Sequence, residues 1–125
     1  MNTDIIILTA YKGGMIERCL DSIQRHVDLK KIGKVVVGCT TDSAFNKASL
    51  LKSRYSFTLQ AYRLEYHFAK CCNALAKKCS SRARLFMNDD VELLEDAVSP
   101  CLNVLEKDSR VGTVGIKLLY GNRTI

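Results

Sequence analysis

Two short runs of branched apolar residues most constrain what this chain can fold into. Residues 5–8 read Ile-Ile-Ile-Leu and residues 35–37 read Val-Val-Val, with no polar residue between the apolar ones. A strand that faces water on one side alternates apolar and polar residues, whereas a strand covered on both faces is apolar throughout. We therefore expect buried strands over residues 4–9 and 34–38, in a sheet with helices on both faces.

Strands and helices are expected to alternate along the rest of the chain. Apolar residues recur at helical spacing in three segments, residues 15–23, 44–52 and 68–79. Further strands are expected over residues 56–62, 84–87 and 111–119. This order predicts the α/β class, with a Rossmann-like, mainly parallel sheet.

One more helix is expected near the end of the chain. Its apolar positions are Leu93, Leu94, Ala97, Cys101 and Leu105. Pro100 lies inside this segment, and a proline in a helix interior removes a hydrogen bond and clashes with the preceding turn. We therefore expect Pro100 to kink or interrupt the helix.

Length and composition indicate one globular domain over residues 1–125. The mass is 14.0 kDa, 47% of the residues are hydrophobic and 26% are charged, which excludes a disordered chain or a collagen-like repeat. No apolar stretch approaches the ~20 residues that span a bilayer, and the N-terminus lacks the pattern of a secretory signal. We expect a cytoplasmic protein.

The six cysteines are interpreted as free thiols. There is no Cys-x-x-Cys pair with a matching second pair, which argues against a zinc site. Cys71, Cys72 and Cys79 share one predicted helical stripe with Phe68 and Leu75, so we expect these three thiols to be buried and unpaired.

The charge is moderately basic, with a net value of +6 at pH 7. A positive excess favours anionic partners such as phosphates, nucleotides or membrane surfaces. The basic clusters, at residues 30–31, 77–78 and 82–84, are typical of solvated helix ends and loops. Aromatic residues are not interleaved with them, so a platform for nucleic acid is not expected.

An acidic pair follows the predicted strand at residues 84–87. In a parallel sheet, ligands bind at the carboxyl ends of the strands, and Asn88-Asp89-Asp90 lies at such an end. Adjacent carboxylates repel each other unless a cation or proton intervenes, and Mg²⁺ or Mn²⁺ prefers oxygen ligands. The alternative is that Asp89 or Asp90 caps a helix that begins near Glu92. Spacing alone does not decide between the two.

The segment 85–93, Leu-Phe-Met-Asn-Asp-Asp-Val-Glu-Leu, closely resembles the acidic motif of family 2 glycosyltransferases of the GT-A fold. Four further segments resemble this family in the correct order, the last of them especially its rhamnosyltransferase-like members: residues 5–12, 19–23, 68–73 and 111–120. The match extends over nearly the whole chain.

The resemblance implies a binding site for a nucleotide-diphosphate sugar. It implies that Asp90 ligates Mn²⁺ or Mg²⁺ and that Asp89 contacts the ribose or the sugar of the donor. Further donor contacts are implied for Thr9, Ala10, Tyr11, Asp42 and His67, although a solvent-facing or internally satisfied His67 is an equal alternative. The implied reaction is transfer of the sugar with inversion to a hydroxyl group of a saccharide, lipid-linked or protein acceptor.

The sequence also departs from the family. Gly38 stands where an acidic residue usually closes the second strand, and Thr9 and Lys12 replace a common proline and asparagine. The catalytic base is expected beyond Ile125, so the chain is expected to be the N-terminal, donor-binding portion of a GT-A domain and inactive by itself. We also expect the exposed edge of its incomplete sheet to favour self-association.

Two other functions stay open from the sequence. One is a pseudoenzyme that binds a nucleotide sugar without turnover. The other is a receiver-type signalling domain, but that fold has its acidic pair at the end of the first strand, where this chain has Leu8-Thr9.

Overall fold

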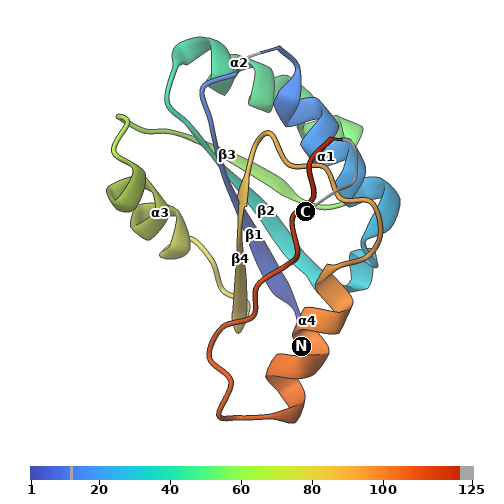
Figure 1. Cartoon of the computed structure of the whole chain (residues 1–125). Coiled ribbons are helices and arrows are strands. Elements are labelled where there is room, and N and C mark those ends of the chain that lie inside the picture. The colour runs from blue at the N-terminus through green and yellow to red at the C-terminus, as the bar shows by residue number, and fades with distance from the viewer. Residues whose placement is uncertain (12, 122–125) are drawn as a thin grey trace.

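The computed structural model describes residues 1–11 and 13–121, which form a four-stranded sheet in the order β3-β2-β1-β4 (Figure 1). The strands are β1 (Thr3–Thr9), β2 (Ile32–Cys39), β3 (Leu59–Arg63) and β4 (Ala83–Asn88). Every pair of neighbouring strands is parallel. The predicted α/β class and Rossmann-like parallel sheet are confirmed, and the strand predicted at residues 56–62 is the edge strand β3, which begins only at Leu59.

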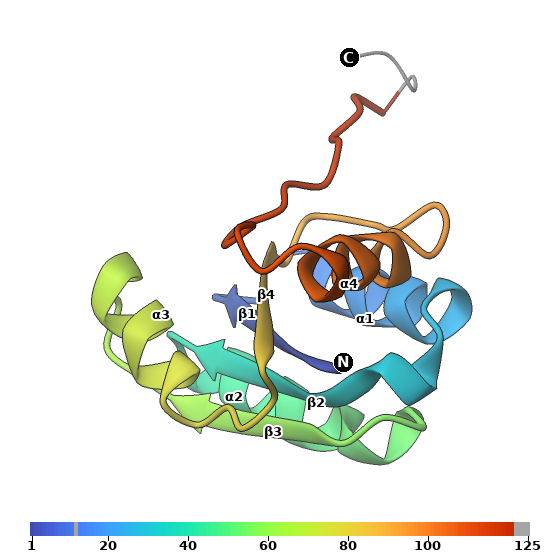
Figure 2. The same cartoon turned by 90° about the horizontal axis from the view of Figure 1, so that it is seen from below.

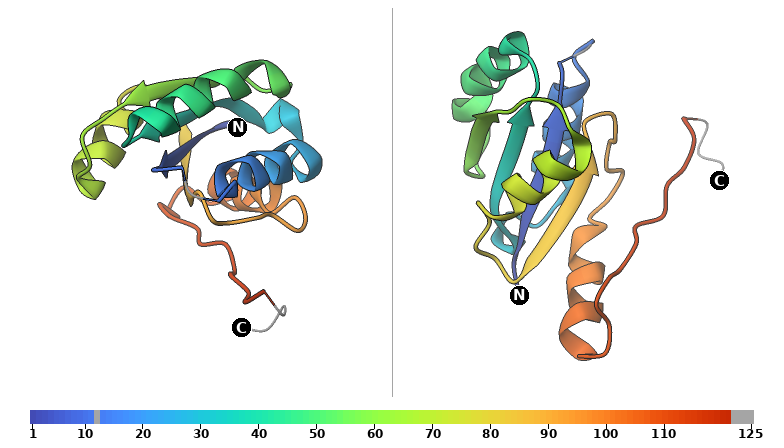
Figure 3. Two further views of the ribbon diagram at one scale, coloured as in Figure 1. Left: turned by 90° about the horizontal axis from the view of Figure 1, so that it is seen from above. Right: turned by 90° about the vertical axis from the view of Figure 1, so that its left-hand side faces the viewer.

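Helices cover both faces of the sheet. They are α1 (Met15–His26), α2 (Asp42–Leu51), α3 (Phe68–Ala76) and α4 (Val98–Lys107), with short 3₁₀ turns η1 (Leu29–Lys31) and η2 (Lys52–Arg54). One face packs against α1, α2 and α4, and the other packs against α3. In the right-hand view of Figure 3, α3 lies in front of the sheet and α1 lies behind it.

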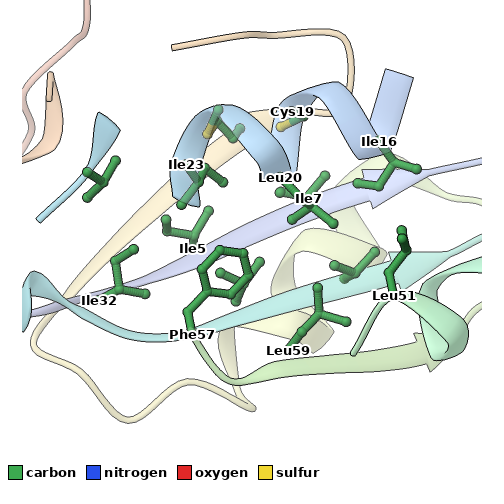
Figure 4. Packing of buried hydrophobic residues seen from close by; sticks show 14 of the residues in the cluster. Ile5, Ile7, Ile16, Cys19, Leu20, Ile23, Ile32, Leu51, Phe57 and Leu59 are labelled. Carbon is green, nitrogen blue, oxygen red and sulfur yellow. The ribbon is translucent and has the colours of Figure 1, made fainter. Parts of the chain in front are cut away.

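The two apolar runs form the centre of the core, as their composition predicts. Ile5 and Ile7 point towards α1 and pack with Leu20 and Ile23 of that helix (Figure 4). Ile6 points the other way and packs with Leu75 of α3. Because successive residues of a strand face opposite sides, a strand covered on both faces needs apolar residues at every position.

Pro100 does not interrupt a helix, because α4 begins only at Val98. The prediction of a helix that already includes Leu93 and Leu94 is wrong, since both residues lie in the loop before it. In the first turn of a helix the backbone N–H groups have no partner within the helix, so a proline is tolerated there. The carboxylate of Asp96 accepts hydrogen bonds from the N–H groups of Val98 and Ser99 and fixes this start.

The strand predicted at residues 111–119 is also absent. This segment has no regular secondary structure; it passes the flank of α4 and leaves the body of the molecule (Figure 2). Leu118 and Tyr120 are 67% and 72% exposed. The segment pairs with no strand among the described residues, and its two glycines, Gly112 and Gly115, weaken an unpaired strand further.

The helical stripe of cysteines is buried only in part. Helix α3 ends at Ala76, so Cys79 lies in the turn after it, and Cys72 is half-buried. Phe68, in the first turn, is 57% exposed. Among the three thiols only Cys71 is buried, although all six cysteines are unpaired as predicted. The residues that the structure describes contain no helix long and apolar enough to cross a bilayer.

Candidate functional site

The residues singled out from the sequence lie at one edge of the sheet, where the parallel strands end. Thr9 ends β1 beside Cys39 of β2, and Asn88 ends β4 beside Leu8. Three loops therefore meet at this edge: the one after Thr9, the one after Cys39 and the acidic turn at Asp89-Asp90. This carboxyl edge is where α/β sheets bind their ligands.

The side chain of Thr9 joins the first loop to the acidic turn. Its hydroxyl donates a hydrogen bond of 2.8 Å to Oδ2 of Asp89 and accepts one of 3.0 Å from the backbone N–H of Tyr11. Thr9 is buried, whereas Asp89 is half-buried and Asp90 is exposed. The hydroxyl thus holds one carboxylate in place 80 residues away in sequence.

The first loop is held in an unusual conformation. Tyr11 has a φ of 58°, in the left-handed region that side chains other than glycine rarely adopt, and Gly13 and Gly14 follow with positive φ values. The hydroxyl of Thr41 donates to the carbonyl oxygen of Ala10 at 3.1 Å. The loops after β1 and β2 are therefore tied together, and the Tyr11 ring lies 5.8 Å from Nζ of Lys47 on α2.

The acidic turn does not cap a helix. Helix α4 begins at Val98, and Asp96 supplies the side-chain hydrogen bonds at its start. The interpretation of Asp89 or Asp90 as a cap for a helix near Glu92 is therefore wrong. The turn itself is closed by the Val91 N–H, which donates to the carbonyl oxygen of Asn88 at 3.4 Å.

Negative charge gathers at the acidic turn. Burial, and then the negative charges of Asp89, Asp90 and Glu92, raise the pKa of the Cys19 thiol beneath the turn to about 12. Asp90 forms no hydrogen bond or ion pair within residues 1–11 and 13–121, so its oxygens are available. The same residues contain no cluster of three metal-ligating side chains. A divalent ion could thus take one carboxylate here and fill its other positions from water or phosphate, as Mg²⁺ often does.

Asp42 and His67 lie at the same edge but do not contact the Thr9–Asp89 pair. Asp42 opens α2 and forms an ion pair of 2.9 Å with Nε of Arg63 at the end of β3. His67 caps α3: its Nδ1 accepts a hydrogen bond from the N–H of Lys70 at 3.3 Å. Both side chains are exposed, and each has a partner of its own.

Arg63 was not among the residues predicted from the sequence. Besides its ion pair with Asp42, its guanidinium donates to the carbonyl oxygens of Cys39 and Leu64. It therefore holds the ends of β2 and β3 together beside the candidate site. The available signal was its position, because a basic residue that ends a short strand of a parallel sheet lies at the ligand-binding edge.

A side chain at Gly38 would have to displace leucine methyl groups. A Cβ atom built there would lie 2.7 Å from both Cδ2 of Leu8 and Cδ1 of Leu75. These contacts are on the apolar side of the sheet that faces α3. A carboxylate at this position would be buried among leucines. It could therefore not serve as a hydrogen-bond acceptor for a ligand at the edge of the sheet.

Comparisons with known proteins show the fold. No protein-family model matches the chain, and no curated protein matches it in sequence. Solved structures of Staphylococcus aureus TarS are similar, with TM-scores of 0.68 to 0.69 at 18% identity over 86% of this chain. The chain spans 20% of the longest TarS chain and 32% of the TarS 1-349 complexes with UDP and with UDP-GlcNAc.

Proposed function

We propose that this chain binds a nucleotide-diphosphate sugar at the carboxyl edge of its sheet, as the donor-binding part of a glycosyltransferase. The observation that carries the proposal is the hydrogen bond between Thr9 and Asp89, which joins the first loop to the acidic turn. The resemblance of both segments to family 2 glycosyltransferases supports it. So does the fold shared with a protein that was crystallised with UDP-GlcNAc.

The proposed roles follow from how each group is held. The strained loop from Thr9 to Tyr11 offers backbone groups and an aromatic ring to the nucleoside. Asp89, oriented by Thr9, accepts hydrogen bonds from the ribose or the sugar. Asp90, which is exposed at the turn, is the proposed ligand of Mn²⁺ or Mg²⁺. When bound, such an ion offsets the charge that develops on the leaving diphosphate.

Transfer also needs a general base next to the acceptor hydroxyl, which typically contributes about 10²–10⁴-fold in rate. Two carboxylates on the neighbouring loops are already engaged, because Asp42 pairs with Arg63 and Glu92 pairs with Arg18. We therefore propose that this chain alone binds the donor without transferring sugar at an enzymatic rate. The proposed complete reaction, with inversion at the anomeric carbon, takes its base from outside the described residues.

Calorimetry tests this function. We expect UDP-GlcNAc to bind more tightly with Mn²⁺ than without it, and Asp90→Asn to remove that gain, a loss of roughly tenfold or more for a charged contact. The control is Glu95→Gln, an exposed acidic residue of the same loop, which should bind like the unmodified chain. Equal affinity with and without metal would contradict the assignment of Asp90.

The free edge of β4 supports a proposal about assembly. No strand pairs with this edge among the described residues, and Phe86 on the same strand is 55% exposed. We propose that two copies pair through this edge, because an unpaired strand is a template for another strand. Analytical ultracentrifugation should show a dimer, and Phe86→Lys should raise its dissociation constant. A chain that stays monomeric at every concentration would contradict the proposed pairing.

A further inference from the structure

Basic side chains gather at the edge of the sheet opposite the candidate site. The strands are parallel and the helices run back between them, so strand starts and helix ends share this edge. Figure 1 shows the starts of β1 and β4 and the end of α4 together at the bottom of the view. We call the following residues the amino-edge basic face: Lys30, Lys31, Lys34, Lys77, Arg82, Arg84 and Lys107.

Different elements bring these charges close together. Glu106 of α4 has a pKa below its ordinary value, chiefly because the N-terminal amine donates a hydrogen bond to it, and Lys31 and Arg82 lower it further. Lys31 belongs to η1 and Arg82 immediately precedes β4, 51 residues apart in the sequence. Cations from separate elements therefore act on one small region.

The acidic groups at this edge do not neutralise the face. Asp4 and Asp28 accept hydrogen bonds from backbone N–H groups, Glu106 pairs with the amine of Met1, and Asp108 pairs with Arg110, so the seven cations of the face outnumber the acidic groups. The amino-edge basic face takes part in no ion pair among the described residues. Its positive charge is thus left to solvent or to a partner.

Helix dipoles account for the placement of only some of these basic residues. Lys77 and Lys107 lie at the ends of α3 and α4, where a cation is favoured by the helix dipole. Arg84 also serves a helix end, because its Nε donates a hydrogen bond of 3.3 Å to the carbonyl oxygen of Ala76, the last residue of α3. Lys34 lies near the start of β2 and Arg82 just before β4, where sheets have only small dipoles. Their presence at the same edge therefore needs another reason.

We propose that the amino-edge basic face docks on a bilayer that contains anionic lipids. The face is built from the ends of η1, α3 and α4 and from the starts of β2 and β4, so it spreads around the end of the sheet. Cations spread over a broad surface can contact a plane of anionic headgroups. Binding of a nucleic acid strand instead requires a narrow basic groove with aromatic side chains on which the bases stack. The opposite edge carries Asp89 and Asp90, which form no ion pair among the described residues, and repulsion would turn this acidic turn away from the bilayer.

Vesicle sedimentation tests the proposal without nucleotide or metal, so its outcome is independent of the proposed donor binding. We expect the chain to sediment with vesicles of phosphatidylcholine and phosphatidylglycerol, and less so as salt is raised. Each cation near an anionic surface contributes about fivefold, so Lys30→Gln/Lys77→Gln should weaken binding roughly 25-fold. The matched control is Lys70→Gln/Lys117→Gln, which neutralises two exposed lysines outside the face.

Three results would overturn the proposal. The first is equal binding to vesicles of phosphatidylcholine alone. The second is the same loss for the control variant as for Lys30→Gln/Lys77→Gln, with both variants folded by circular dichroism. The third is binding to single-stranded or duplex DNA that matches or exceeds vesicle binding at the same ionic strength, which would assign the face to nucleic acid.

Discussion

Asp4 is a charged residue in the most buried strand of the sheet, and only 1% of it is exposed. Its carboxylate accepts hydrogen bonds from the N–H groups of Lys34, Ser80 and Ser81 and from the Ser81 hydroxyl. It thereby ties the starts of β1 and β2 to the loop before β4. A Cβ atom at Gly33 would collide with the carboxylate and with the Ser81 hydroxyl, so glycine is required beside it.

We expect Asp4→Asn to lower the free energy of unfolding at neutral pH by roughly 2–3 kcal/mol, since an amide nitrogen would face donors that need an acceptor. Burial raises the pKa of Asp4, but the hydrogen bonds from Ser81, Ser80 and Lys34 outweigh it and place the pKa below 3.8. A lowered pKa stabilises the fold above the unfolded value and loses that effect as the pH falls through the folded value. Urea unfolding should therefore show that the difference in free energy of unfolding between the unmodified chain and Asp4→Asn disappears below about pH 3.8. A difference that is constant with pH would contradict this role.

The helices and strands with a strong apolar pattern were predictable from the sequence. Those whose formation depends on tertiary contacts or on a pairing strand were not. The runs at Ile5 and Val35 identify buried strands because each residue faces a covered side. The loop before α4 also carries regular apolar spacing, but Leu93 is buried there without being helical, with its N–H bonded to the Ser22 hydroxyl. Residues 111–119 have a strand-like composition, yet a strand exists only where a neighbour pairs with it.

The candidate site was predictable to a similar extent. The carboxyl edge followed from the parallel sheet, and the acidic turn followed from its place after a buried strand. The hydrogen bond from the Thr9 hydroxyl to Asp89 could not be predicted, because it depends on how the ends of β1 and β4 are aligned. The partners of Asp42 and His67 are equally a matter of tertiary structure.

At Gly38 of β2 we expect a larger side chain to destabilise the packing between the sheet and α3. Gly38→Ala needs only the methyl ends of the Leu8 and Leu75 side chains to move, so its cost should lie at or below the lower end of the roughly 1–3 kcal/mol of an overpacked core. Gly38→Asp should cost more, because it also buries a carboxylate among leucines. The control is Gly112→Asp, where an added Cβ meets nothing within 4 Å. Thermal melts that show Gly38→Asp and Gly112→Asp to be equally stable would contradict this account.

At the scale of the whole molecule, the parallel topology separates two kinds of surface. The carboxyl edge gathers the acidic turn, the strained first loop and the Asp42–Arg63 pair. The amino edge gathers basic side chains and the buried Asp4. One edge thus holds the proposed site for a metal and a diphosphate and the other holds the face proposed to bind an anionic surface, and the length of the strands keeps them apart.

The most direct test of the central claim is to map nucleotide binding by NMR. Titration of the ¹⁵N-labelled chain with UDP and Mg²⁺ should shift the amide signals of Thr9, Tyr11, Thr41 and Asp90 at the carboxyl edge. The amides of Lys31 and Arg82, at the opposite edge, should not shift. Shifts confined to the amino edge, or none at saturating nucleotide and metal, would contradict the account.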